Sequence, residues 1–205
     1  MNFRLSILAF FLVLLNTSFS QVISLEQPEL MVLYRGYPNQ MLVNIPETSE
    51  LSVNDISVTG TNVSISKVNK PGGYIVKPAG GKIAVIVLKK GVGDSLQEIY
   101  RTEYRVSNLP DPVLFWGGSK SGTKASKSSR ALLAKYPPEI PLKAAFRVTK
   151  WTLSCNGEKA TGVSGSLGPS GTIIVNTTEG SQVAITATVV GPDGIARQIG
   201  GAWSL

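Results

Sequence analysis

The side chains best suited to covalent chemistry are few in this chain of 205 residues. It contains no histidine, so Ser-His and Cys-His nucleophiles are excluded, and the lone Cys155 cannot complete the usual zinc ligand sets. The S-x-x-K spacing occurs at Ser64–Lys67 and Ser121–Lys124. The first pair falls in an expected strand and the second in a Gly-rich loop, whereas this motif works on a helix that aims both side chains together. Both pairs are therefore interpreted as chance spacings.

Carboxylates and phosphate-binding loops offer no better site. The acids are scattered, and Asp111 and Asp193 stand beside prolines in turns, where Asx-type hydrogen bonds are usual. Neither a P-loop nor a dinucleotide-binding glycine motif is present. We therefore expect no catalytic residue, no metal, no cofactor and no enzyme activity. A Ser–Lys or paired-acid enzyme stays as the weakest alternative.

The N-terminal 20 residues have the layout of a secretory signal peptide. Arg4 precedes an apolar run over 5–15, which is too short to span a bilayer comfortably, and small polar residues follow. We predict cleavage after Ser20, which leaves no transmembrane segment; an uncleaved anchor is the alternative. The chain is then periplasmic, or else secreted or at the cell surface. In an oxidising compartment, Cys155 is either a buried inert thiol, which we favour, or an intermolecular disulfide partner.

Residues 22–107 predict an immunoglobulin-like sandwich. About seven short strand candidates follow one another at turn spacings near ten residues. The last is the clearest, since Tyr100, Thr102, Tyr104 and Val106 alternate with charged side chains. The expected strands are 30–34, 41–45, 51–58, 62–68, 74–78, 82–89 and 99–106.

A hinge is predicted directly after this unit, in the stretch NLPDPVLFWGG. Its two prolines remove two backbone donors and fix two φ angles immediately after a strand. A flexible linker would be longer and rich in Gly and Ser. The predicted interdomain hinge comprises Leu109, Pro110, Asp111 and Pro112.

The second half predicts another β unit with one short helix. The segment 128–137 is expected to be that helix, with a serine cap and Pro137 as its end. In the strand expected over 142–155, the apolar residues change parity, which a β-bulge near Lys150 would correct. Further strands are expected at 171–178, 182–190 and 195–205, the last two joined by a tight G-P-D-G turn at 191–194.

Two groups of residues after the hinge are candidates for binding a partner. The basic, Ser-rich loop is either simply solvated or an electrostatic contact with an acidic partner, in a chain whose net charge is +7. The aromatic pair either packs the hinge against the second unit or anchors a partner. These candidates are Lys120, Lys124, Lys127 and Arg130 in the loop, and Phe115 and Trp116 beside the hinge.

Five stretches, in this order, resemble the C-terminal half of the gliding-motility and type IX secretion family GldM/PorM. They are YRGYPNQMLVNIP (34–46), YIVKPAGGKIAVIVLKK (74–90), EYRVSNLPDPVLFWGG (103–118), SSRALLAKYPPEIPLKAAFRVTKWTLS (128–154) and ATVVGPDGIARQIG (187–200). The resemblance implies two periplasmic β domains of the Bacteroidota type IX secretion system. In that family a dimeric shaft rises from an inner-membrane motor, and its terminal domain meets an outer-membrane-associated ring. This chain departs from the family in having a cleavable signal where the family has a transmembrane helix.

The sequence thus predicts an all-β protein with a signal peptide (1–20), an immunoglobulin-like domain (21–108), the hinge (109–112) and a GldM C-terminal-like domain (113–205). The expected function is a non-enzymatic exported scaffold or adaptor that contacts ring or shaft proteins of the envelope machinery. A homodimer is left open, and no nucleic-acid partner is expected. The alternative is a secreted adhesion or glycan-binding module, with Tyr100, Tyr104 and Trp151 as the candidates for stacking on sugars.

Overall fold

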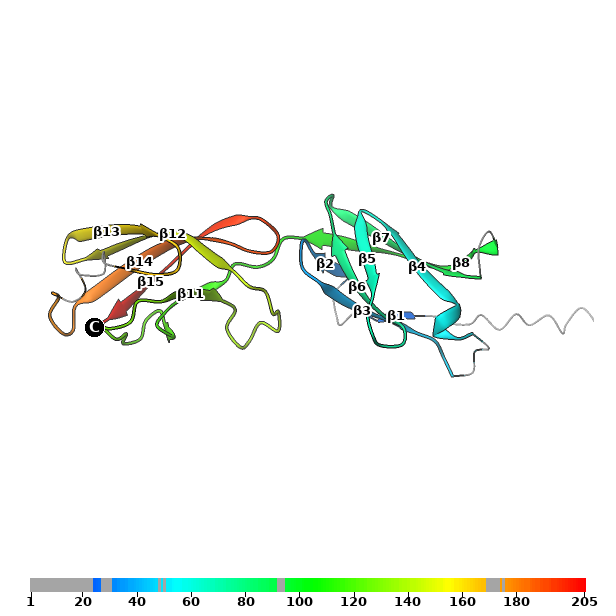
Figure 1. Cartoon of the computed structure of the whole chain (residues 1–205), viewed down its shortest axis with the longest axis horizontal. Coiled ribbons are helices and arrows are strands. Elements are labelled where there is room, and N and C mark those ends of the chain that lie inside the picture. The colour runs from blue at the N-terminus through cyan, green and yellow to red at the C-terminus, as the bar shows by residue number, and fades with distance from the viewer. Residues whose placement is uncertain are drawn as a thin grey trace, which may run out of the picture.

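The computed structural model describes residues 24–26, 31–47, 49, 51–91, 95–168, 174 and 176–205. The predicted signal peptide lies outside these residues. Within them the chain is mostly β-strand and forms two β-sandwiches, one after the other along an elongated molecule (Figure 1). The predicted all-β sandwich architecture is therefore confirmed. In the described ranges, no helix has the length and apolar character needed to cross a membrane.

The first sandwich contains two four-stranded sheets in the orders β1-β3-β6-β5 and β2-β8-β7-β4. This order, with β2 running parallel to β8 and the other pairs antiparallel, matches the immunoglobulin arrangement of an ABED sheet on a GFC sheet. A 3-10 turn (Val53–Asp55) capped by Ser52 precedes β4. The strands are β1 (Ser24–Glu26), β2 (Val32–Tyr34), β3 (Asn39–Asn44), β4 (Ile56–Thr61), β5 (Val63–Lys67), β6 (Gly73–Pro78), β7 (Ile83–Lys90) and β8 (Gln97–Ser107).

The alternation predicted for the last strand of this sandwich is confirmed in β8. Thr102, Tyr104 and Val106 are buried, and the charged side chains between them are exposed. Tyr104 packs in a core with Leu33 and Ile86 from the neighbouring strands of the same sheet. The period-two pattern therefore placed this strand correctly with respect to both faces of the sheet.

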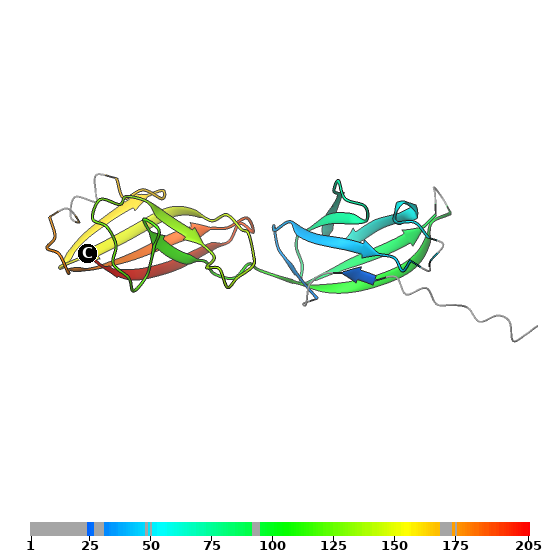
Figure 2. The same ribbon diagram turned by 90° about the horizontal axis from the view of Figure 1, so that it is seen from below.

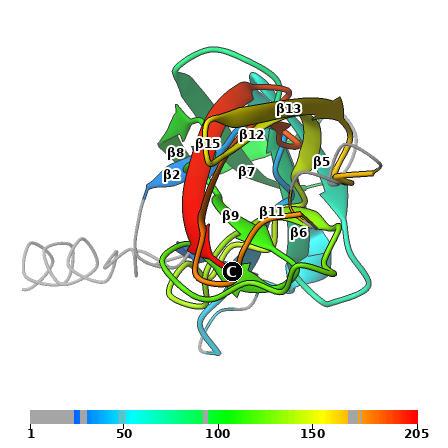
Figure 3. The same cartoon turned by 90° about the vertical axis from the view of Figure 1, so that its left-hand side faces the viewer.

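The second sandwich packs a three-stranded sheet, β10-β9-β11, against a four-stranded sheet, β13-β12-β14-β15. The view along the long axis shows these two layers face to face (Figure 3), and Figure 2 shows the same strands from below. The strands are β9 (Val113–Trp116), β10 (Ser119–Lys120), β11 (Leu132–Lys135), β12 (Arg147–Cys155), β13 (Glu158–Val163), β14 (Gln182–Val190) and β15 (Ala196–Ser204).

All three tryptophans of the chain lie in the core of the second sandwich. Trp116 and Trp203 meet edge to face with ring centroids 5.9 Å apart, and Trp151 is buried in the same cluster. Each indole N–H donates to a backbone carbonyl at 3.1 Å. Buried indoles usually need such a partner, because an unpaired donor in a core is costly.

The short helix predicted across 128–137 is wrong. Leu132–Lys135 form β11, which pairs antiparallel with β9. Leu132 and Ala134 are buried while Leu133 and Lys135 are exposed, which is the alternation of a strand. The helix propensity of Ala-Leu-Leu-Ala is a weak preference, and pairing with β9 in the core overrides it.

Elsewhere in the second half, the predicted β-bulge is confirmed and one predicted strand is not. The pairing of β12 with β14 shifts register between Val148 and Lys150, and both Val148 and Trp151 are buried as a result. Of the strand predicted over 171–178, the described residues are 174 and 176–178, and none of them is in a strand.

Candidate functional site at the junction of the sandwiches

Residues 108–112 connect β8 to β9, and side chains of the second sandwich hold their backbone. The Leu109 N–H donates to Asp193 Oδ2 at 3.2 Å, and its carbonyl accepts from Arg197 Nη2 at 2.7 Å. The Pro110 carbonyl accepts from the Tyr136 hydroxyl at 2.8 Å. Three backbone groups of the predicted hinge are thus bound to residues distant in the sequence.

Arg197 is the central residue of this junction. Its guanidinium bonds both carboxylate oxygens of Asp193, with Nη1 3.0 Å from Oδ1. Its Nε lies 3.0 Å from Asp111 Oδ1. The side chains of Arg197 and Asp193 are 6% and 0% exposed, whereas that of Asp111 is 73% exposed. One arginine therefore joins a buried carboxylate, an exposed carboxylate and the backbone of the hinge.

Asp193 is positioned by the G-P-D-G turn between β14 and β15. Its Oδ1 accepts from the Ile195 N–H at 3.2 Å, which is the Asx-type bond expected from the sequence. The Gly194 N–H closes the turn on the Gly191 carbonyl at 3.0 Å. The turn therefore helps to position the carboxylate that Arg197 and Leu109 bind.

One ring of an aromatic pair contacts the guanidinium. Arg197 lies over the Phe146 ring, 5.6 Å from its centroid, and Tyr136 meets Phe146 edge to face at 5.2 Å. A cation over an aromatic face is stabilised by the ring quadrupole. Arg197 is thus held both by oxygen acceptors and by an aromatic platform.

The charged and hydroxyl groups of the junction respond to this burial. Burial alone would raise the pKa of Asp193, but hydrogen bonds from Arg197 and from two backbone N–H groups, with the charge of Arg197, hold this pKa below its ordinary value. The hydrogen bond to Asp193 raises the pKa of Arg197. Burial raises the pKa of Tyr136 to about 12. The ion pair therefore stays charged at neutral pH.

The first sandwich contributes the turn between β2 and β3. The Asn39 side chain organises this turn by donating to the carbonyls of Tyr34 and Tyr37 and accepting from the Tyr34 N–H. Gly36 has φ +65° and lies against the second sandwich, where an added Cβ would stand 2.3 Å from the Pro192 carbonyl oxygen. Only glycine fits this position without strain or a clash.

A second contact across the junction involves Tyr37, whose hydroxyl accepts from the Lys143 N–H at 3.1 Å. The Y-R-G turn, the N-L-P-D-P hinge and the G-P-D-G turn are far apart in the sequence but lie together here. Among the described residues, no group of three or more His, Cys, Asp and Glu side chains could hold a metal ion. The three segments are held by hydrogen bonds between side chains and backbone and by the Arg197–Asp193 ion pair.

The basic loop does not form one free cationic patch. Lys124 Nζ pairs with Glu179 at 3.0 Å, both largely exposed. Lys127 and Arg130 are half-buried. The Lys127 ammonium donates to the Thr177 carbonyl, and Arg130 Nη1 donates to the Lys127 carbonyl. Lys120 is exposed on β10. The loop therefore presents Lys120 and Lys124 to solvent more than the other two cations.

The aromatic pair beside the hinge is buried. Trp116 is fully enclosed in the core against Trp203. Phe115 is 8% exposed, and the Lys135 ammonium lies 4.6 Å from its ring centroid. Neither ring is presented on the surface as an anchor for a partner.

Three of the four side chains of the two S-x-x-K pairs make hydrogen bonds within the fold. Ser121 Oγ donates to the Ala202 carbonyl and accepts from the Ala202 N–H, at 3.3 and 3.0 Å, while Lys124 binds Glu179. Ser64 Oγ donates to the Lys77 carbonyl at 3.4 Å within the sheet. These bonds hold the loop and the strand in place. In the described structure, neither pair has a hydrogen bond between its serine and its lysine.

Two aromatic residues considered for sugar stacking, Tyr104 and Trp151, are 1% and 2% exposed, so neither has a free ring face. Cys155 is also buried, and burial, with the nearby Glu158 charge, raises the pKa of its thiol. A thiol held in its protonated form is a poor nucleophile.

Arg197 is the residue that sequence analysis missed. The available signal was parity, because Arg197 shares the inward-facing register of β15 with Ile199 and Trp203. An arginine at a core position of a strand needs a carboxylate partner. That partner, Asp193, lies only four residues earlier.

Residues 22–107 match the family model of the GldM third domain. No curated protein matches the chain. The matched residues are those of the first sandwich, and the match indicates a protein associated with the gliding and type IX secretion machinery. The chain thus resembles the periplasmic domains of GldM/PorM.

Proposed function

We propose that this protein is a non-enzymatic, exported scaffold or adaptor of the type IX secretion and gliding envelope machinery. It acts through protein–protein contacts, with outer-membrane-associated ring or shaft proteins as its partners and the periplasm as its compartment. The match of residues 22–107 to the GldM third domain supports this proposal. In this proposal the domains are 21–108 and 113–205, and the second is the counterpart of the GldM C-terminal domain.

The observation that carries the proposal is the buried Arg197–Asp193 pair that binds the backbone of Leu109. A scaffold must hold its binding surfaces at a fixed separation, whereas domains joined by a free linker move independently. In our proposal the hinge at Leu109–Pro112 is a stiff joint, and the two sandwiches form one rod. The exposed cations Lys120 and Lys124 are the candidates for contact with an acidic partner.

Crosslinking and pull-down from the envelope of the native organism tests the function. A C-terminally tagged chain, expressed from its full coding sequence, should recover ring or shaft proteins of the secretion machinery. A matched sample with Lys120→Glu and Lys124→Glu shows whether the loop contributes. Recovery of the chain alone, or of surface glycan, would contradict the scaffold role and favour the adhesion alternative.

A further inference from the structure

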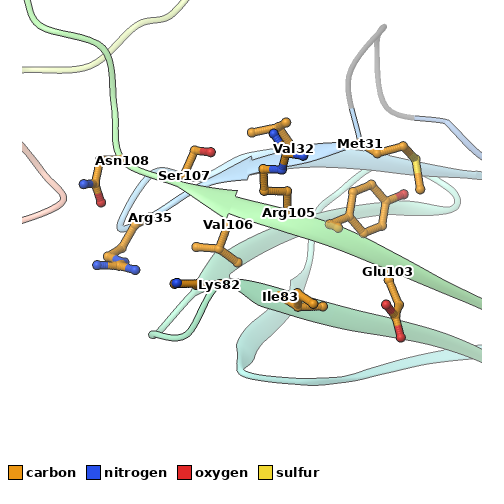
Figure 4. A pocket seen from close by; sticks show the side chains of 11 residues that line it. Met31, Val32, Arg35, Lys82, Ile83, Glu103, Arg105, Val106, Ser107 and Asn108 are labelled. Atoms are coloured by element: carbon orange, nitrogen blue, oxygen red, sulfur yellow. The ribbon is translucent and has the colours of Figure 1, made fainter.

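The outer face of the β2–β8–β7 sheet carries an open groove of about 870 Å³ beside the junction. Figure 4 shows side chains from all three strands around it, from Met31 at one end to Asn108, the residue before the hinge. Val32, Arg105 and Ile83 are direct neighbours across the three strands. Seven of the eleven lining residues lie in these strands, and Met31, Arg35, Lys82 and Asn108 stand directly beside strand ends.

The groove exposes two large apolar side chains. Met31 and Ile83 are 55% and 50% exposed, and both line the groove. Single exposed apolar residues are ordinary, but two large ones in one hollow are typical of a contact surface.

Cations predominate around this apolar floor. Arg35, Lys82 and Arg105 line the groove with a single carboxylate, Glu103. Among the described residues, none of the three cations has a carboxylate within ion-pair distance. By contrast Arg101, further along the same face of β8, is already paired with Glu98 at 2.8 Å.

Arg35 retains capacity for hydrogen bonds. Its Nη2 donates to the Gly81 carbonyl at 3.0 Å. Its Nε has no acceptor among the described residues but is enclosed, so the side chain must move to present it to a ligand. An arginine fork suits a carboxylate, because it can donate two parallel hydrogen bonds to it.

We propose that this groove docks an acidic segment with interspersed apolar side chains from a partner protein. The carboxylates of the segment pair with Arg105, Arg35 and Lys82, and its apolar side chains cover Met31 and Ile83. This inference rests on the proposed function and names the chemistry of the partner. A second copy of the same face fits less well, because a symmetric contact would bring the same unpaired cations together.

The probe is a fluorescein-labelled peptide of alternating Glu and Val, with a Gln and Val peptide as its neutral counterpart. Anisotropy titrations use the full chain and its Arg105→Glu and Lys159→Glu variants. Lys159 is exposed on β13 of the other sandwich, away from the groove. Both variants replace a cation with a carboxylate, so they change the net charge equally. Circular dichroism verifies that each variant is folded.

The acidic peptide should bind the unmodified chain, with an affinity that falls as salt increases. Arg105→Glu should weaken binding by about tenfold or more, as expected for the loss of a charge-assisted bond, and Lys159→Glu should have little effect. The neutral peptide should bind about tenfold more weakly than the acidic one. An Ile83→Ser variant should also bind more weakly, since it removes apolar contact.

Equal loss of affinity in Arg105→Glu and Lys159→Glu, or equal binding of the two peptides, overturns the proposal. Arg105-dependent binding to phosphatidylglycerol vesicles without peptide binding overturns it in favour of a lipid surface. If the Arg105→Glu variant still recovers the same envelope proteins in the same yield, the proposed docking site in the groove is wrong and the scaffold role stands. If the unmodified chain binds the peptide but recovers no envelope protein, the groove is supported and the scaffold role fails.

Discussion

Two ion pairs of the second sandwich have similar chemistry but different surroundings. Arg197 and Asp193 at the junction are almost fully enclosed. Lys124 and Glu179, which connect the basic loop to the segment before β14, are 67% and 78% exposed. The loop is conspicuous in the sequence because its charges are clustered, while Arg197 is a single charge in an apolar strand.

The comparison shows that burial, rather than charge density, decides which pair matters for the fold. In solvated ion pairs, water and salt screen most of the attraction between the two charges. A buried pair is costly to form, but removal of one partner strands the other charge in a medium that cannot solvate it. The junction should therefore be sensitive to single substitutions, and the loop insensitive.

Arg197→Leu should give the largest effect. It leaves the Asp193 carboxylate buried without its cation, so we expect the second sandwich to lose about 3–5 kcal/mol of unfolding free energy. Urea unfolding followed by tryptophan fluorescence measures this loss, because Trp116, Trp151 and Trp203 all lie in that sandwich.

The matched control for this variant is Arg101→Leu, which breaks the exposed pair with Glu98 in the first sandwich. It should leave the tryptophan-monitored midpoint unchanged. If Arg197→Leu were equally silent, the junction would be no more important than a surface contact.

Acid should have the second-largest effect. Protonation of Asp193 removes the same ion pair that Arg197→Leu breaks. The pKa of Asp193 is lowered in the folded chain, so its stabilising contribution is complete above the unfolded pKa of about 3.9. That contribution is lost as pH falls through the folded pKa. The urea midpoint should therefore decrease on acidification below about pH 4.

In the Arg197→Leu variant the dependence of stability on pH should change, because burial without the arginine raises the pKa of Asp193. The stability difference between the two chains should be largest at neutral pH and smaller in acid. A difference that is constant with pH would mean that Asp193 is not the group that Arg197 neutralises.

Gly36→Ala should have a smaller effect on stability but a specific effect on the joint. The residue would adopt a left-handed φ at a cost of about 1–3 kcal/mol, and its Cβ would collide with the Pro192 carbonyl. Residual dipolar couplings should show a changed angle between the two sandwiches. Gly157→Ala is the control, since Gly157 has φ +85° with open space around it, and it should leave that angle unchanged.

Lys124→Gln should give the smallest effect. The pKa of Glu179 is lowered through its hydrogen bond with Lys124, but both groups are solvated. We expect no measurable change in the thermal unfolding midpoint at either low or high salt. A clear destabilisation that salt abolishes would show that the loop supports the fold after all.

Much of the fold could be predicted from local pattern. The alternation of β8 and the parity change that required a bulge at Val148–Lys150 are both recorded in consecutive residues. The same reasoning failed at Leu132–Lys135, where the local sequence favours a helix and pairing with β9 imposes a strand. Pairing partners distant in the sequence leave no periodic signal in the segment itself.

The sequence by itself determined the two β units, the two prolines that fix φ angles in the segment between them, and the turns with Gly36 and Asp193. These features depend on side-chain alternation and on backbone angles set by individual residues. Only the tertiary structure decided that Arg197, 88 positions beyond Leu109, binds its carbonyl. The same is true of the burial of Phe115 and Trp116 and the exposure of Met31 beside Arg105. The burial and the contacts of a side chain depend on which surfaces, distant in the sequence, pack together. The alternation of residues along one strand shows only which side chains share a face.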